Sequence, residues 1–65
     1  MIKLKAGKSV TSQLREIGLN DELEIMFQEK LPHIVRALCS KLTKNEGLHY
    51  EFQITNNSTI IKRIK

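Results

Sequence analysis

The 65-residue sequence predicts a small α+β domain that spans residues 1–65, with the order strand, helix, helix, strand, strand. Apolar and polar residues alternate strictly near the C-terminus, which is typical of strands. Apolar residues recur at helical spacing through the middle of the chain, and glycine, asparagine and proline separate the segments. We therefore expect a three-stranded, mostly antiparallel sheet with two helices on one of its faces.

The N-terminal segment predicts a short strand. Apolar residues at positions 2, 4 and 6 alternate with Lys3 and Lys5 before Gly7 ends the pattern. Such alternation gives one apolar face and one lysine face.

A short helix is expected next. Ser9 is a suitable N-cap, and apolar residues recur at helical spacing from Val10 to Ile17. Gly18 followed by Leu19 predicts a left-handed stop with a hydrophobic contact.

The segment from Asn20 to Lys44 predicts a second, long helix. Asn20 is a suitable N-cap, and the carboxylates of residues 21–24 suit the positive end of a helix dipole. Pro32 requires either a kink or two helices, the second having Pro32 in its first turn. We favour a kinked or narrowly broken helix that Gly47 terminates, because an apolar stripe passes through the proline without a change of phase: Leu23, Phe27, Leu31, Ile34, Val35, Leu38 and Leu42.

Residues 48–65 predict a β-hairpin whose turn contains Asn56 and Asn57, residues that tolerate left-handed backbone. A two-residue turn pairs Phe52 with Ile61 and Glu51 with Lys62. A three-residue turn instead pairs Ile54 with Ile60 and Glu51 with Arg63. Both registers remain open from the sequence.

Composition restricts the class of protein. A single cysteine, Cys39, excludes a disulfide scaffold and a thiolate zinc module. No apolar stretch approaches the length of a membrane span, and the N-terminus lacks the apolar block of a signal peptide. We expect a soluble cytoplasmic protein. Because a chain this short builds only a small core, we also expect self-association to contribute to its stability.

No catalytic or cofactor motif is present. His33 and His49 have no companion at ligand spacing, and Cys39 is expected to be a small core residue. The acidic residues near position 21 are explained by the helix dipole without a metal. We therefore expect no enzyme, no cofactor, no metal site and no small-molecule substrate.

Two surfaces are candidates for function. The net charge is +4, and the excess of positive charge lies in the two end segments of the chain. The candidate phosphate-binding residues in these segments are Lys3, Lys5, Lys8, Lys62, Arg63 and Lys65. If the terminal strands are neighbours, these charges gather on one sheet face, although lysines also protect sheet edges from pairing. The helical stripe offers a protein interface at Phe27, Leu31, Ile34, Val35, Leu38 and Leu42.

Two segments of the chain are similar in outline to known DNA-binding motifs. Residues 10–27 follow a helix-turn-helix outline, but the acidic start of the second helix would repel phosphate, which excludes it. Residues 2–44 are similar to a ribbon-helix-helix dimer, to which the hairpin is foreign. Our leading hypothesis is a small, non-catalytic regulatory or adaptor protein that acts by protein association, as a homodimer or with another protein. The alternative is a nucleic-acid-binding module that uses the basic strands.

Overall fold

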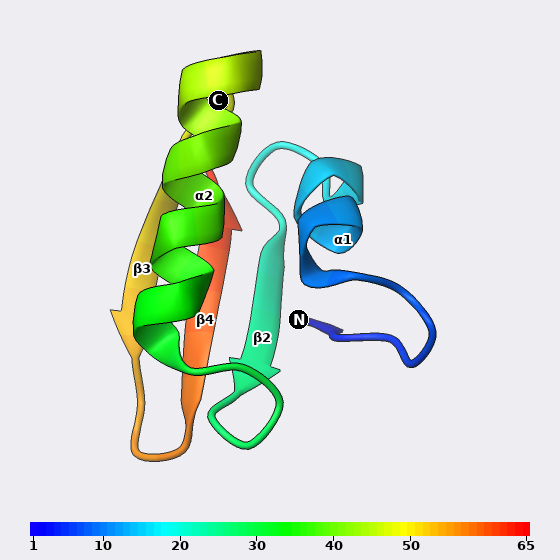
Figure 1. Ribbon diagram of the computed structural model, residues 1–65, viewed down its shortest axis with the longest axis vertical. Helices are drawn as coiled ribbons and strands as arrows, with labels where there is room; N and C mark the ends of the chain where they lie inside the picture. The colour runs from blue at the N-terminus through cyan, green and yellow to red at the C-terminus, as the bar shows by residue number, and fades with distance from the viewer.

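The computed structural model describes residues 1–65 and contains four strands and two helices (Figure 1). In chain order these are β1 (Ile2–Lys3), α1 (Val10–Glu16), β2 (Glu22–Met26), α2 (Pro32–Glu46), β3 (Tyr50–Ile54) and β4 (Ser58–Arg63). The predicted α+β class and the number of helices are confirmed. No helix has the length and apolar character that crossing a bilayer requires.

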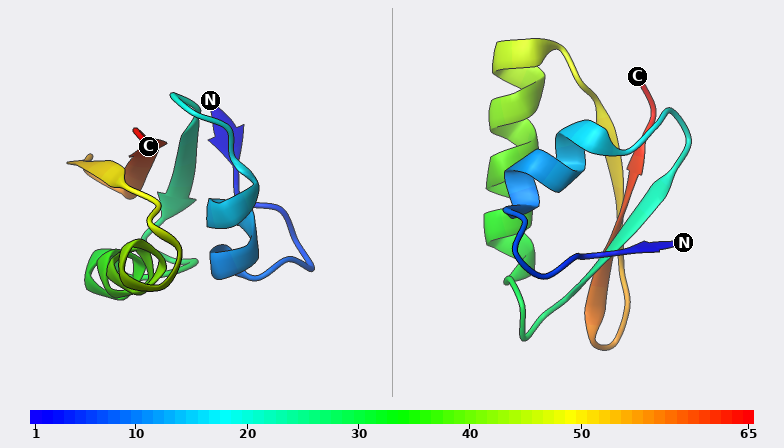
Figure 2. Two further views of the ribbon diagram at one scale, coloured as in Figure 1. Left: turned by 90° about the horizontal axis from the view of Figure 1, so that it is seen from above. Right: turned by 90° about the vertical axis from the view of Figure 1, so that its right-hand side faces the viewer.

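The strands form one mixed sheet in the order β1-β2-β4-β3. β1 and β2 are parallel and α1 connects them, as a parallel pair requires. β2 and β3 each pair antiparallel with β4. Both helices cover the same face of the sheet, so the molecule has two layers and one sheet face is open to solvent (Figure 2).

The prediction of a helix from Asn20 to Lys44 is wrong in its first half. Residues 22–26 form β2, which adds a fourth strand to the expected three. Leu23 and Ile25 point toward the helices and are fully buried, whereas the intervening Glu24 lies on the open face. Burial against Ile61 and Thr59 of β4 outweighs the helical preference of the local sequence.

Pro32 begins α2 instead of bending it. It occupies the first helical turn, where its missing amide proton costs nothing. The predicted place of Pro32 in the first turn of a helix is therefore confirmed, whereas the kinked helix is wrong and the helix expected before Pro32 is the strand β2. Gly47 ends α2 in the predicted left-handed conformation, with a φ of 73°.

α1 begins as predicted but ends differently. The Ser9 hydroxyl accepts a hydrogen bond of 3.1 Å from the Ser12 amide. Gly18 has no positive φ, and its amide donates instead to Asp21 Oδ2 at 3.0 Å. Leu19 is exposed, so the predicted hydrophobic contact is absent. Asn20 supplies the left-handed residue, with a φ of 69°.

The hairpin of β3 and β4 adopts the register of a two-residue turn. Phe52 lies opposite Ile61, and Glu51 lies opposite Lys62. The turn does not use the left-handed backbone expected of its asparagines. It is closed instead by Thr55, whose amide donates to the Ser58 carbonyl at 2.9 Å and whose hydroxyl accepts from the Ser58 amide at 3.0 Å.

The core lies between the sheet and the two helices. Its nine buried apolar residues are Val10, Leu14, Ile17, Leu23, Ile25, Val35, Cys39, Leu42 and Ile61. The buried Gln13 side chain ties the N-terminal segment to this core. Its Oε1 accepts from the Lys5 amide at 2.9 Å, and its Nε2 donates to the Lys3 carbonyl at 2.8 Å.

Candidate functional site

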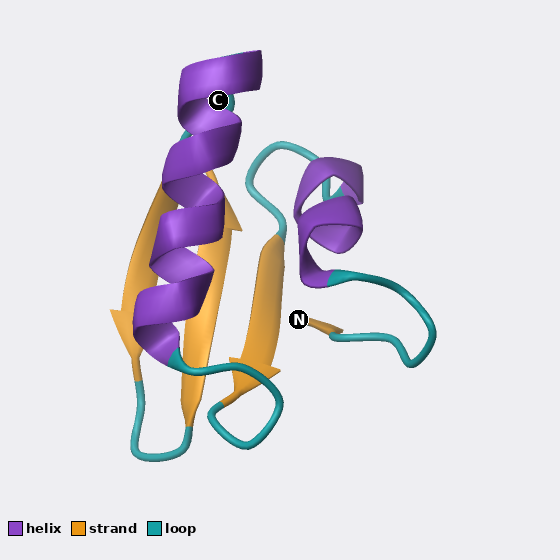
Figure 3. Ribbon diagram, in the orientation of Figure 1, coloured by secondary structure: helices purple, strands orange, loops and turns teal.

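The two edges of the sheet differ in how they resist pairing with another strand. β1 is only two residues long, and lysines stand at positions 3 and 5. Short length and lysine both discourage strand addition. β3, at the other edge, is five residues long and contains no lysine, proline or glycine (Figure 3). β3, whose only charged residue is Glu51, is therefore the less protected edge.

The hydrogen-bonding phase of the hairpin shows which groups of β3 are free. The Thr55 amide bonds to Ser58, and the Ile64 amide bonds to the His49 carbonyl at 2.9 Å. Because bonding alternates along an antiparallel pair, residues 49, 51, 53 and 55 direct their backbone groups toward β4. Tyr50, Phe52 and Ile54 then direct their N–H and C=O groups outward, and no turn or loop hydrogen bond uses those groups.

The side chains of β3 alternate between the two faces of the sheet. Tyr50, Phe52 and Ile54 lie on the helix side, whereas Glu51 and Gln53 are exposed on the open face. The Tyr50 hydroxyl donates to the Leu14 carbonyl at 2.8 Å, and burial raises the pKa of this phenol. Ile54 is 53% exposed, so β3 ends with an apolar side chain in solvent.

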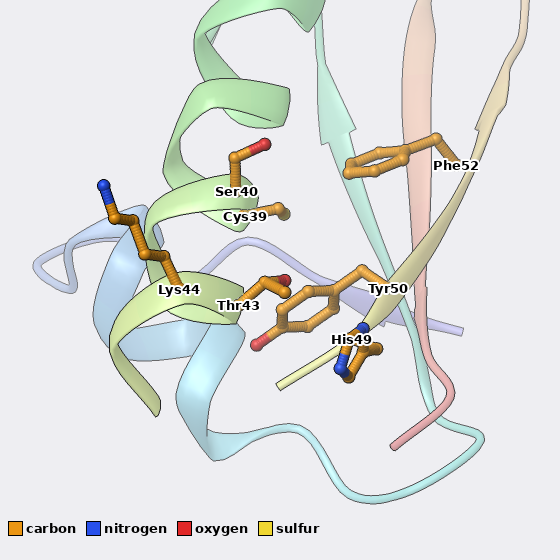
Figure 4. Close-up of a pocket in the computed structure, with 7 residues that line it drawn as sticks. All are labelled: Cys39, Ser40, Thr43, Lys44, His49, Tyr50 and Phe52. Carbon is orange, nitrogen blue, oxygen red and sulfur yellow. The ribbon is translucent and has the colours of Figure 1, made fainter. Parts of the chain in front are cut away.

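A hollow of about 330 Å³ lies between α2 and β3 (Figure 4). Cys39 and Thr43 extend from α2 toward the strand, and Tyr50 and Phe52 extend from the strand toward the helix. Burial raises the pKa of the Cys39 thiol to about 12. The thiol therefore stays protonated at neutral pH and is a poor nucleophile. Ser40, Lys44 and His49 complete the lining of the hollow, which is therefore partly apolar and partly polar.

The guanidinium of Arg36 lies over the ring of Phe52, which is one of the residues that line the hollow. Its central carbon lies 5.6 Å from the centre of the Phe52 ring, within the range of a cation–π contact. The Arg36 side chain stays exposed, so its charge remains in contact with water.

The apolar residues proposed as a protein interface divide between the core and the surface. Val35 and Leu42 are buried, and neither is accessible to a partner. Phe27 and Leu38 are partly buried. Leu31 is 50% exposed and Ile34 is 38% exposed. These two residues lie at the start of α2, which is the end of the molecule where β3 also ends (Figure 1).

The six basic residues do not gather on one face. β2 separates β1 from β4, so the terminal strands are not neighbours as that hypothesis requires. Lys3 forms an ion pair with Glu24, and Lys8 forms one with Glu16 at 2.7 Å. Arg63 lies on the helix side and donates to the Ile17 carbonyl at 3.0 Å. Lys5 and Lys65 are exposed at the chain ends.

The open face of the sheet carries mixed charge. Lys62 is flanked by Glu22 on β2 and by Glu51 on β3. Glu24 lies on the same face, where the hydrogen bonds from Lys3 and from the Ser58 hydroxyl lower its pKa. A polyanion that approached the open face would meet not only the lysines of that face but also three carboxylates, those of Glu22, Glu24 and Glu51.

The acidic residues near position 21 have local structural roles, although not the predicted role in a helix. Asp21 accepts from the Gly18 amide, and Glu29 Oε1 accepts from the Met26 amide at 3.1 Å. His33 and His49 are both exposed. No group of three or more histidine, cysteine or carboxylate side chains is placed to hold a metal ion.

The sequence alone did not identify the edge of β3 as a candidate site, although the composition of this strand was an available signal. The run of residues 50–54 contains no lysine or proline, and Glu51 is its only charged residue. That signal becomes informative only when the strand order places β3 at an edge. No protein-family model matches the chain, and neither a curated protein nor a solved structure is significantly similar to it.

Proposed function

We propose that the protein is a non-catalytic interaction module that recruits a partner protein by adding an extended strand to the free edge of β3. The observation that carries this proposal is the set of outward backbone groups of Tyr50, Phe52 and Ile54, on an edge strand without lysine or proline. In strand addition, such groups supply affinity and the alternating side chains supply specificity.

The distribution of charge favours a protein partner over a nucleic acid. Lys3 and Lys8 are paired with carboxylates, and Lys62 lies between two glutamates. Phosphate binding requires cations that are free to replace counterions. The apolar residues Leu31, Ile34 and Ile54, exposed near the end of β3, would instead contact the side chains of an added strand.

The test is a titration of isotopically labelled protein with extended peptides whose apolar residues alternate. We expect amide shifts at Tyr50, Phe52 and Ile54, with little change at β1. The matched variant is Ile54→Pro. Its outward amide has no partner in the fold, so the fold keeps its hydrogen bonds while strand addition loses one and meets the proline ring.

A short mixed-sequence duplex and its single strand, at low and moderate salt, complete the experiment. Peptide binding that Ile54→Pro abolishes supports the proposal. Salt-sensitive binding of either oligonucleotide without peptide binding would instead establish the nucleic-acid function. Absence of both kinds of binding by the monomeric chain would also contradict strand addition.

A further inference from the structure

The β3 edge is complementary to itself. We infer that the strand it recruits is β3 of a second copy of this chain, paired antiparallel about a two-fold axis at Phe52, so that two sheets become one continuous sheet. This inference rests on the proposed function, because it uses the same free edge. It names the partner and the register.

The hydrogen-bonding phase selects this register. A two-fold axis at Phe52 places Phe52 opposite its counterpart and Tyr50 opposite Ile54 of the second copy. All three outward-facing residues then exchange bonds in pairs, for about six hydrogen bonds in the interface. An axis at Gln53 would place Tyr50 opposite the turn. An axis at Glu51 would place two Glu51 carboxylates face to face, which is unfavourable.

The side chains agree with the same register. On the helix side, Ile54 of each copy lies beside Tyr50 of the other, next to the hollow lined by Cys39, Thr43 and Phe52. The exposed apolar side chain of Ile54 therefore lies against the ring of Tyr50 at two symmetric places, as an interface between identical copies requires. On the open face, Glu51 lies opposite the neutral Gln53 of the second copy, so no like charges oppose each other along the paired strands.

A second copy also explains why a chain with a small core leaves apolar surface exposed. The core contains nine buried apolar residues, while Leu31, Ile34 and Ile54 remain at least one-third exposed. Domains this small commonly depend on association for part of their stability. The axis brings the two Arg36 groups toward each other, and their exposure to water keeps this repulsion weak.

Opposite charges at position 53 test the register. Gln53→Lys places a lysine opposite Glu51 of the second copy at two symmetric sites, whereas Gln53→Glu places a glutamate there. We expect Gln53→Lys to tighten the dimer and Gln53→Glu to weaken it, each by about 2- to 30-fold in Kd. Lysine at a sheet edge ordinarily opposes pairing, so tightening by Gln53→Lys is specific to this register.

The measurement is sedimentation equilibrium of the full chain and the three variants, with thermal unfolding confirming that each variant is folded. We expect a dimer for the unmodified chain and a monomer for Ile54→Pro. A chain that stays monomeric at millimolar concentration overturns the inference, as does a dimer that Ile54→Pro leaves intact. Equal effects of the two charges at position 53 overturn the register. If the chain is monomeric yet binds extended peptides, only the second copy is excluded and the proposed function stands.

Discussion

The guanidinium of Arg63 donates a hydrogen bond of 3.0 Å to the carbonyl oxygen of Ile17. Ile17 is the C-cap residue of α1, where helix carbonyls lack partners within the helix. A residue of β4 therefore completes the end of a helix far from it in the sequence. The backbone strengthens this connection, because the Arg63 amide donates to the Asp21 carbonyl at 3.1 Å and the Asn20 amide donates to the Arg63 carbonyl at 2.7 Å.

Arg63→Ala is expected to destabilise the fold by about 1–3 kcal/mol, because it leaves the carbonyl of the buried Ile17 without its charged donor. Urea unfolding measures the change in the free energy of unfolding. Lys65→Ala is the control, since this exposed terminal side chain should contribute little. Equal effects of the two substitutions would mean that net charge, and not the bond to Ile17, is responsible.

Gln13→Leu is expected to release β1 from the rest of the fold. Leucine keeps the apolar bulk of the buried side chain but loses both hydrogen bonds to the N-terminal segment, at a cost of about 1 kcal/mol. Amide hydrogen exchange should accelerate in the β1–β2 pair and remain unchanged in the β3–β4 hairpin. Gln28→Leu, at an exposed position, should leave both regions protected.

Thr59→Val is expected to stabilise the protein by about 1 kcal/mol. The Thr59 hydroxyl is buried without a hydrogen-bond partner, and valine has nearly the same shape. The melting temperature should rise by about 4–8 °C for a domain of this size. Thr55→Val is the matched control and should lower it, because the Thr55 hydroxyl accepts from the Ser58 amide. A lower melting temperature for Thr59→Val would indicate a partner for its hydroxyl.

Stability is expected to fall in acid through Glu24. Lys3 and Ser58 hold the pKa of this carboxylate below its ordinary value. A lowered folded-state pKa adds stability that is complete above the pKa of an unfolded glutamate, about 4.3. That stability is lost as pH falls below this value and through the folded-state pKa. Urea unfolding as a function of pH measures the loss, and Glu24→Gln should flatten the curve. If Glu24→Gln leaves the pH dependence of the free energy of unfolding unchanged, other groups cause the loss of stability in acid.

The sequence was sufficient for the elements whose signals are local. The Ser9 cap, the Gly47 stop and the alternating hairpin all depend on residues close together, and the structure confirms them. The position of Pro32 in the first turn of a helix is also a local signal, although the sequence does not show that a strand precedes this helix.

The error over residues 22–26 arose because the deciding interaction is distant in sequence. Leu23 fits both a helical stripe and an alternating strand, and only its pairing with Ile61 distinguishes them. The sheet order follows from that pairing, and the order in turn decides which strand is the free edge and whether the lysines meet. Both candidate surfaces therefore depended on one long-range contact.

The contrast between the tight β3–β4 turn and the distant pairing of β2 with β4 also has a kinetic consequence. A hairpin with a two-residue turn closes on a microsecond timescale, whereas pairing β2 with β4 must close a loop that contains all of α2. We therefore expect β2 to join a hairpin that already exists. Until it does, the side of β4 that β2 will occupy is also free, so the hairpin has two open edges at which newly made chains can misassemble.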